Sequence, residues 1–586
     1  MSKRLFVIFL DGADEGFVRQ ALSDGLLPNL AAMAKTGTYS PLATSCPAES
    51  PVAFAEVLTG RNPGKHGLFD FLHRDPATRL PSIALFDYDG ERFTNNLAAP
   101  TFCTPLKNAG IKTALVRIPS TFPPPDDADL VLSGLGVPDA SGTWGRAQLF
   151  SKEADASGDI FGTMRKTYRR EHDHYLLDLD GPGATATLKV ERTDDKFLLN
   201  GVELPREAFG PWMRVTFENG KYALIAVHVR LVDGTPEFLV TPCWTDPLHA
   251  SLPACRPDDL ARVLAEQHGD YPLAGWAEPN LLLAEGLIER RAFFEMCRRV
   301  ADATDAHIFD ILNNTDYDLV MANLEFFDRV AHAGFGPAAA KDVQAQLMGV
   351  LVRFDAFVGK VRDAHPDATL WIASDHGFAP WTRRVNVNRW LAENGYLRAD
   401  LAAPDPDLRT LAGEGVFWSG VDWSRSRAYA VGLSKIYLNL EGREAGGIVA
   451  PGKPVRELKQ ELIERLTALR DPENGKAIFR RVLDAQRLYS GQALGRSGDL
   501  ILCYNPGYRT DWASSLGGTG TPVVAANDRE WSADHCGVDP ELIPGIFFSA
   551  SAIEGDGPAL RDIAPSILRF FGLPPDPDMD GRPILR

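Results

Sequence analysis

The chain has 586 residues, of which 45% are apolar and 24% are charged, and its formal net charge is −17 at pH 7. This acidic balance argues against a nucleic-acid-binding protein, because affinity for a phosphate backbone comes from clustered Lys and Arg. The length exceeds what one core usually organises, so we expect two or more lobes or one large domain with insertions.

The first apolar segment, residues 5–10, predicts a buried strand. It is shorter than the core of about 7–15 residues in a signal peptide, and no small-residue cleavage site follows it. No run of about 18 apolar residues occurs, which predicts a chain that does not span a membrane. Seven scattered cysteines without CxxC spacing are typical of a reducing compartment. We therefore expect a cytoplasmic protein.

Short apolar, β-rich segments alternate with helical patterns along much of the chain. We expect strands at residues 5–10, 112–118, 130–132, 319–324 and 369–373, and helices around residues 17–35 and 341–365. This alternation predicts an α/β fold with a mostly parallel central sheet and helices on both faces. Ligands of such sheets bind at the carboxyl ends of the strands, so residues of a functional site are expected there.

Two segments depart from this pattern. Hydrophobic alternation between about residues 183 and 242 predicts an antiparallel β insertion. Residues from about 380 to 529 mix helices, strands and Gly/Pro-rich loops, and we expect them to form a cap over the active face. The predicted boundaries are residues 1–165, 251–379 and 530–586 for the three parts of the core, 166–250 for the β-rich insertion and 380–529 for the cap region.

The stretch AESPVAFAEVLTGRNPGKHG, residues 48–67, places Ser50 directly before Pro51. One interpretation is structural, since Ser is a good N-cap and Pro is favoured at the first helical position. The other is that Ser50 is a nucleophile, held where backbone N–H groups and the helix dipole favour negative charge. The neighbouring Glu49 is expected to be a surface or capping charge.

Acidic and imidazole side chains follow two of the predicted strands. Asp11 ends the first strand, where it is either a helix cap or a ligand. Asp328 and His332 are four residues apart, so on a helix both side chains can reach one ion. The same spacing also arises by chance in a chain with twelve histidines.

Asp375 and His376 follow another predicted strand and precede Gly377, which lets the backbone turn. Two adjacent residues of metal-binding type at a strand end are hard to explain as packing. His535 lies shortly before a further apolar segment, where it is either a ligand or a solvent-facing side chain. Its neighbour Cys536 has no second cysteine at the spacing of a soft zinc site.

Together these positions supply three carboxylates, three imidazoles and one hydroxyl. Such mixed nitrogen and oxygen ligands suit Zn²⁺, or alternatively Mn²⁺, better than Ca²⁺ or Mg²⁺. Six ligands divide into two three-ligand sites, and two metals about 3.5–4 Å apart can stabilise both the entering and the leaving oxygen of a displacement at phosphorus. A bound cation would also activate the Ser50 hydroxyl, which is a weak nucleophile by itself.

At these residues the chain resembles the alkaline phosphatase superfamily, in its type I phosphodiesterase/nucleotide pyrophosphatase branch. The motifs that carry the resemblance are FLDGAD, SPVAFAEVLTGRNPGKHGLFDF, NLEFFDRVAH, SDHGF and DIAPSILRFFGLPPDPDMDGRPI. The resemblance implies a three-layer α/β/α fold in which Ser50 accepts the phosphoryl group and two divalent metals assist. The implied ligands are Asp11, Asp375, His376 and the Ser50 oxygen for one metal, and Asp328, His332 and His535 for the other.

One departure from the family pattern concerns the substrate. Nucleotide-pyrophosphatase relatives place an Asn shortly after the HG turn, where this chain has Asp70 and Phe71, and the arginine clamp of the alkaline phosphatases has no obvious counterpart. Backbone N–H groups from Val52 onward are expected to donate to the phosphate instead. The resemblance therefore implies hydrolysis of a small-molecule phosphate ester more firmly than action on nucleotide diesters.

The main hypothesis is thus a two-metal phosphodiesterase with a serine nucleophile. The alternatives within the superfamily are a phosphomonoesterase, a phosphonate hydrolase and an enzyme like cofactor-independent phosphoglycerate mutase. A sulfatase is disfavoured, because CPAES lacks the C-x-P-x-R run from which those enzymes make formylglycine. A non-catalytic binding protein that kept the fold is a further alternative, although no expected site residue is lost.

Overall fold

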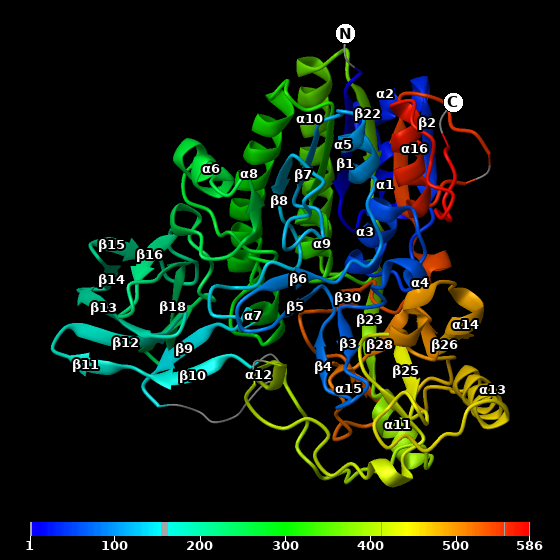
Figure 1. Cartoon of the computed structure of the whole chain (residues 1–586). Coiled ribbons are helices and arrows are strands. Elements are labelled where there is room, and N and C mark those ends of the chain that lie inside the picture. Colours follow the sequence, from blue (N-terminus) through cyan, green and yellow to red (C-terminus); the bar gives the residue numbers. More distant parts are fainter. Residues whose placement is uncertain (1–2, 144, 154–161, 412, 556, 585–586) are drawn as a thin grey trace.

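The computed structural model describes residues 3–143, 145–153, 162–411, 413–555 and 557–584 (Figure 1). Two buried cores lie on the two faces of one large sheet, and smaller clusters stabilise the peripheral sheets. Among the helices of the described residues, none combines the length and the apolar character that a bilayer crossing requires.

The central sheet has eight strands in the order β2-β31-β22-β1-β21-β7-β8-β20. The bounds are Thr38–Leu42 for β2, Gly545–Ser549 for β31, Thr369–Ala373 for β22, Leu5–Leu10 for β1, Leu319–Leu324 for β21, Thr113–Val116 for β7, Leu130–Leu132 for β8 and Cys255–Arg256 for β20. The five strands from β22 to β8 are mutually parallel, whereas β2, β31 and β20 pair antiparallel at the two sides. The predicted, mostly parallel sheet is confirmed.

Helices cover both faces of this sheet and thereby bury its central strands on both sides. Val7 of β1 packs in one core and Ile8 in the other. The first core includes residues of α3 (Ser50–Thr59) and α16 (Ile563–Phe570), and the second includes residues of α8 (Arg290–Asn313) and α10 (Lys341–Ala364). Figure 1 shows these two helix pairs on opposite sides of β1. The predicted three-layer arrangement is therefore confirmed.

The helix expected around residues 17–35 is in fact two helices. Helix α1 spans Glu15–Ser23 and α2 spans Pro28–Thr36. Gly25 adopts a left-handed conformation with φ of 72°, and Pro28 has no N–H to continue a helix from the preceding turn. The break lies between the two helices for these two reasons.

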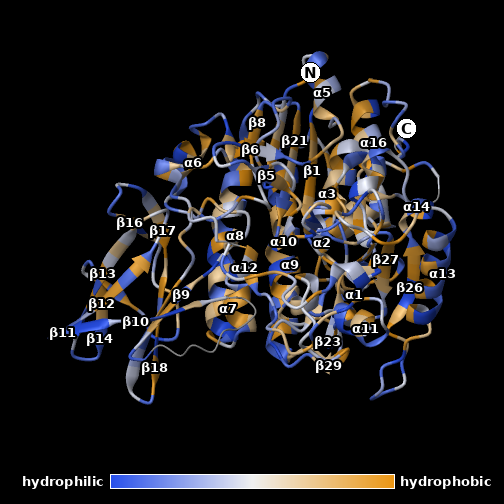
Figure 2. Ribbon diagram, turned by 60° about the horizontal axis from the view of Figure 1, so that its bottom comes forward, coloured by the Kyte–Doolittle hydropathy of each residue, from blue (hydrophilic) through white to orange (hydrophobic). Residues whose placement is uncertain are grey.

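An antiparallel β region extends to one side of the core. Its five-stranded sheet has the order β11-β12-β13-β14-β15, with bounds Arg169–Glu171, His174–Asp180, Thr185–Thr193, Lys196–Leu199 and Val202–Leu204. Buried and exposed residues alternate along β13, as expected for a sheet with one solvated face. Figure 2 shows this region projecting from the hydrophobic central strands. The predicted antiparallel insertion is confirmed, while its outer limits stay predictions.

The region expected to form a cap contains two further sheets. One is built on β23 (Ala379–Val385), which follows the central strand β22 by a short loop and pairs with β30 (Ala533–Asp534). The other is antiparallel, in the order β24-β25-β27-β26, with bounds Ala428–Ala430, Lys435–Leu438, Leu500–Tyr504 and Phe479–Asp484. The pairing of β23 with β30 brings residue 535 beside the carboxyl end of the central sheet.

Candidate active site

Three neighbouring parallel strands deliver three carboxylates to one edge of the central sheet. Asp11 directly follows β1 and Asp375 follows β22 by two residues. Asp328 lies on α9 (Phe326–Ala331), the short helix that begins just after β21. Since β1 pairs with both β21 and β22, the side chains converge at the carboxyl end of the sheet, as the sequence predicted.

Asp11, Asp375 and His376 form the first buried group. Potential ligand atoms of all three lie within 4.8 Å of one another. The Nε2 atom of His376 is 3.1 Å from Asp375 Oδ2 and 3.7 Å from Asp11 Oδ1. The exposed fraction of each side chain is at most 2%, so solvent contributes little to compensating their charge.

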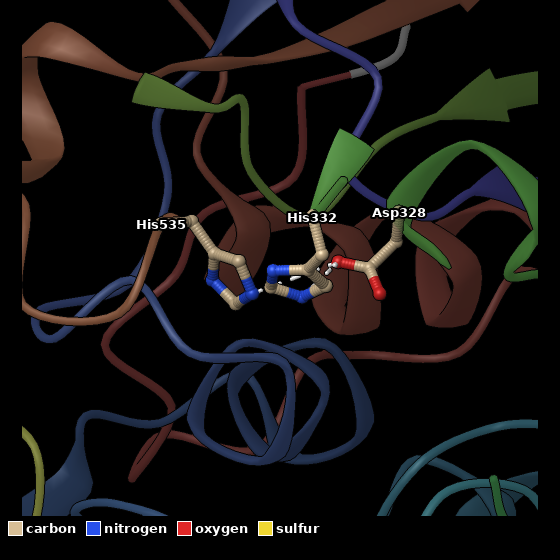
Figure 3. Close-up of side chains that lie close together, drawn as sticks. All are labelled: Asp328, His332 and His535. Carbon is tan, nitrogen blue, oxygen red and sulfur yellow. Dashed lines mark ion pairs between the residues drawn. The ribbon is translucent and has the colours of Figure 1, made fainter. Parts of the chain in front are cut away.

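Asp328, His332 and His535 form the second buried group (Figure 3). The Nε2 atoms of His332 and His535 are 3.5 Å and 3.6 Å from the same oxygen, Asp328 Oδ1. His332 is the C-cap residue of α9, so the predicted i, i+4 spacing does bring it onto the face of Asp328. His535 reaches this group from the loop after β30. It is buried, and the solvent-facing alternative for it is wrong.

Backbone carbonyl groups orient all three imidazoles. The Nδ1 atoms of His376, His332 and His535 lie 3.1, 3.1 and 2.7 Å from the carbonyl oxygens of Gly377, Ala533 and Ala48. A carbonyl oxygen only accepts, so each Nδ1 carries the hydrogen, and in the neutral ring each Nε2 keeps a lone pair. Such a fixed tautomer is typical of metal-ligating histidines.

The negative charges of the buried carboxylates in the two groups are not fully compensated by the protein. Asp11 Oδ1, Asp375 Oδ2 and Asp328 Oδ1 are buried, and unless an imidazole Nε2 carries a proton they accept no hydrogen bond from the described residues. Burial and the nearby charges of Asp375 and Asp328 raise the pKa of Asp11 well above its usual range. Buried carboxylate oxygens without a donor are costly unless a cation compensates them. The donor set of both groups therefore fits divalent cations.

Imidazole charge differs between the two groups. Burial opposes a proton on His376, yet the carboxylates of Asp375 and Asp11 outweigh this effect and raise the pKa of the imidazole to about 9. Burial and the neighbouring His376 lower the pKa of His535 to about 3. A cation at the first group would take the position of the proton on His376 Nε2, since ligands bind metals in their deprotonated form.

Ser50 lies beside the first group. Its Oγ is 3.2 Å from His376 Nε2, and the residue is only 4% exposed. The N-cap of α3 is Glu49 rather than Ser50, and Ser50 is the first residue of the helix. The capping interpretation of Ser50 is therefore wrong. The structure brings together Ser50, Asp11, Asp328, His332, Asp375, His376 and His535.

Glu49 is not the surface charge that the sequence suggested. It is fully buried, and its carboxylate accepts the N–H of Phe71 at 3.0 Å. Asp70 is also buried and lies 3.6 Å from the ammonium group of Lys435. Burial and the charge of Asp70 raise the pKa of Glu49 well above its usual range. Both acids are buried and accept hydrogen bonds from the protein instead of facing solvent.

The expected backbone donors to a phosphate are already committed within α3. The N–H groups of Val52 and Ala53 both donate to the carbonyl oxygen of Glu49, at 2.9 and 2.8 Å. The prediction that these amides face the site is wrong. It fails because the helix begins one residue earlier than a serine cap would require.

Sequence reasoning missed two residues that support the site. Asn323, the last residue but one of β21, donates its amide to Asp11 Oδ2 at 2.9 Å. Arg329 donates from Nη1 to Asp328 Oδ2 and from Nε to Glu278 at 3.3 Å. Its Nη2 is buried without a hydrogen-bond partner in the described chain. Both residues belong to the motif NLEFFDRVAH, so their proximity to Asp328 was the available signal.

A cavity of about 270 Å³ opens onto Ser50 and the second group. Its lining includes Ser50, Asp328, Arg329, His332 and His535. The guanidinium of Arg329 packs on Trp276, 3.8 Å from the ring centroid. The remaining walls come from distant parts of the chain, including Phe71, the residue that replaces the Asn of the family pattern. A molecule in this cavity would contact the nucleophile and Arg329 together.

Comparison with known protein families identifies one family that matches most of this chain. A profile of the family "Type I phosphodiesterase / nucleotide pyrophosphatase" matches residues 5–522. A search of curated protein sequences gave no match.

The solved structures that match this chain share little sequence with it. The phosphonoacetate hydrolase of Sinorhizobium meliloti with phosphonoacetate is 14% identical, with a TM-score of 0.49, covering 96% of this chain and 94% of its own. Human ectonucleotide pyrophosphatase/phosphodiesterase 5 is 11% identical, with a TM-score of 0.45, covering 99% and 97%. The inactive murine form of the latter with AMP is 12% identical, with a TM-score of 0.44, covering 98% and 96%.

Proposed function

Because the chain belongs to the type I phosphodiesterase/nucleotide pyrophosphatase family of the alkaline phosphatase superfamily, whose members hydrolyse phosphoesters, we propose that it is a phosphodiesterase with a serine nucleophile and two divalent metals. One observation carries this proposal: the Oγ of Ser50 lies 3.2 Å from His376 Nε2, beside two buried carboxylate–imidazole groups. A capping serine or a structural histidine would not require this arrangement.

Asp11, Asp375 and His376 would hold one metal, with the Ser50 oxygen beside it, and Asp328, His332 and His535 would hold the other. The orphaned oxygens Asp11 Oδ1, Asp375 Oδ2 and Asp328 Oδ1 support this division. The combination of imidazole and carboxylate donors favours Zn²⁺, with Mn²⁺ as the alternative. When bound, such a pair supplies Lewis acidity to phosphate oxygens and lowers the pKa of a coordinated hydroxyl or water.

Ser50 performs the displacement in this proposal. Its Oγ forms a bond to phosphorus while the bond from phosphorus to the leaving oxygen breaks, and the Oγ proton is lost as the leaving alcohol gains one. Water then cleaves the phosphoserine ester and restores the hydroxyl. The net reaction is hydrolysis of one ester bond, with Ser50 regenerated.

Arg329 binds the phosphate in this proposal. Arg329 lines the same cavity as Ser50, its Nη2 has no hydrogen-bond partner among the described residues, and its ion pairs with Asp328 and Glu278 fix the plane of the guanidinium. A preorganised N–H donor of this kind is most valuable where negative charge develops in the transition state. Arg329 thus donates to the phosphate in place of the backbone N–H groups of α3, from which the sequence predicted this hydrogen bond.

The test measures metal content, hydrolysis of an aryl phosphodiester and covalent labelling by a radioactive phosphate ester. We expect the wild type to contain about two metals per chain, to hydrolyse the diester and to form a phosphoserine, whereas Ser50→Ala keeps the metals and loses turnover and label. Ser133→Ala is the matched control, because this buried serine donates to Thr121 outside the site. Full turnover by Ser50→Ala would overturn the nucleophile assignment. A metal-loaded wild type that hydrolyses neither diesters nor monoesters would support a binding protein.

A further inference from the structure

The cavity above Ser50 has mainly apolar walls, and their composition bears on the substrate. Four tryptophans line it, Trp244, Trp276, Trp512 and Trp531, together with leucines such as Leu281 and Leu411. Trp244 lies near the end of the β-rich insertion, and Trp276 and Leu281 lie just before and at the start of α7 (Asn280–Ala284). Leu411 and Trp512 belong to the cap region, and Trp531 lies just after it. Their convergence encloses a volume that an organic group of a substrate can fill.

The aromatic wall begins at the second carboxylate–imidazole group. The ring of Trp531 lies 4.4 Å from that of His332 between centroids, and Trp512 lies 5.2 Å from Trp531. The indole N–H of Trp531 donates to Asp534 and that of Trp276 donates to Asn280, both at 2.9 Å. Their polar edges are thus used within the protein, and apolar ring surface is what they offer to a ligand.

Charged groups in the walls have partners within the protein. Glu278 pairs with Arg329 at 3.3 Å, and Arg509 pairs with Asp534 at 2.8 Å. Asp139 accepts backbone N–H groups of its own turn, including that of Gly145 at 2.8 Å. Arg329, whose Nη2 has no partner among the described residues, lines the cavity together with Ser50, and the phosphate would bind there. A ligand that carries many hydrogen-bonding groups would lose water here without replacement partners.

We infer that the substrates are phosphate esters in which a bulky apolar group, aryl or alkyl, occupies this cavity, rather than esters of a nucleoside. The inference rests on the proposed function, since it treats the part of the cavity lined by Ser50 and Arg329 as the phosphate site. The apolar group leaves water as it enters the cavity, and the gain in affinity grows with the area that it buries.

The test is calorimetric titration of the metal-loaded protein with alkyl- and arylphosphonates, whose C–P bond is not the ester bond that the proposed function cleaves. Methylphosphonate, hexylphosphonate and phenylphosphonate share one anionic group and differ in apolar size. We expect hexylphosphonate or phenylphosphonate to bind at least about 30-fold more tightly than methylphosphonate, since each buried methylene contributes up to about fourfold. If phenylphosphonate binds more tightly than hexylphosphonate, the apolar group of the substrate is aryl. If hexylphosphonate binds more tightly, that group is an alkyl chain. Thymidine 5′-monophosphate should bind less than threefold more tightly than methylphosphonate.

Variants test the location of the apolar group. Leu281→Gln should weaken phenylphosphonate binding about tenfold or more and leave methylphosphonate binding unchanged, which also shows that the protein is folded. Leu488→Gln is the matched control, because this leucine is 37% exposed and lies outside the cavity lining. Equal affinities for all phosphonates, or thymidine 5′-monophosphate binding as tightly as phenylphosphonate, would overturn the inference while hydrolysis still supported the proposed function. Apolar preference without hydrolysis of any ester would overturn the proposed function instead.

Discussion

The imidazoles of His376 and His535 stack face to face, with ring centroids 3.5 Å apart and an angle of 13° between the planes. Each ring belongs to a different carboxylate–imidazole group, so the two groups are in direct contact and a charge in one acts on the other. Burial, and next to it the charge favoured on His376, lower the pKa of His535 and so disfavour a proton on it. The second group therefore keeps a neutral His535, which is the form that binds a cation.

Removal of one imidazole should remove one metal. We predict that His332→Ala lowers the bound metal from about two to about one equivalent, because the Asp328 group would keep only two of its three protein ligands. Mass spectrometry of digested protein measures the metal content. His174→Ala, in the β insertion, is the matched control and should keep both metals. Loss of metal from the control, or retention by His332→Ala, would contradict the assignment of the second group.

Chelation should destabilise the folded protein. Without cations, Asp11, Asp375 and Asp328 crowd their charges in a buried space, and burial keeps solvent from relieving them. Cations that bind the folded state alone stabilise it by about 2.7 kcal/mol at 100 times their Kd. We expect chelator treatment to lower the Tm by several degrees and added Zn²⁺ to restore it. A Tm that does not depend on metal would argue against preformed sites.

Arg329→Gln should impair catalysis more than metal binding. Loss of one preorganised donor to a developing negative charge typically costs about 10²–10³ in kcat. We therefore expect kcat/KM for an aryl phosphodiester to fall by about that factor, with two metals still bound. Arg169→Gln, at a half-exposed position on the β insertion, should leave both values unchanged. Unaltered kcat/KM in Arg329→Gln would exclude a contact with the phosphate.

Acidification should destabilise the protein through buried histidines outside the site. Burial lowers the pKa of His66 and His307 to about 3 and that of His228 to about 4. In the unfolded chain these groups titrate near 6.5, so the unfolded state binds more protons below that pH. The stability that they contribute is fully present above pH 6.5 and is lost as the pH falls towards 4.

The expected loss in the free energy of unfolding is about 1.4 kcal/mol per pH unit for each such imidazole once the unfolded form is protonated. Chemical denaturation between pH 7 and pH 4.5 measures it. His66→Asn should reduce the pH dependence by about one proton, whatever its effect on stability at pH 7. An unchanged slope in that variant would show that His66 titrates normally in the folded protein.

Much of the fold and of the candidate site follows from local sequence. The apolar runs that end at Asp11 and just before Asp375 predict parallel strands, and parallel strands bring their carboxyl ends to one edge. The spacing of Asp328 and His332 predicts a shared helix face. These features depend on backbone geometry over a few residues, so the local residue pattern is enough to predict them.

Other features depend on contacts between distant segments, which no local pattern reports. Glu49 is adjacent to Ser50 in sequence, but only the approach of Phe71 and Ser434 buries its carboxylate. The direction of the Arg329 guanidinium is set by Glu278 and Trp276, from another part of the chain. The cavity likewise has walls from several remote segments, so its apolar character could not be predicted before the structure.

The position of β31 has a consequence for folding. This strand lies between β2 and β22, next to the strands that carry the site, although long stretches of chain separate it from both. His535 lies ten residues before the first residue of β31. The chain must therefore extend past β31 before the sheet closes and the last imidazole arrives. Chains truncated before residue 535 would carry Ser50 but lack the complete candidate site, so the proposed hydrolysis would require this late segment.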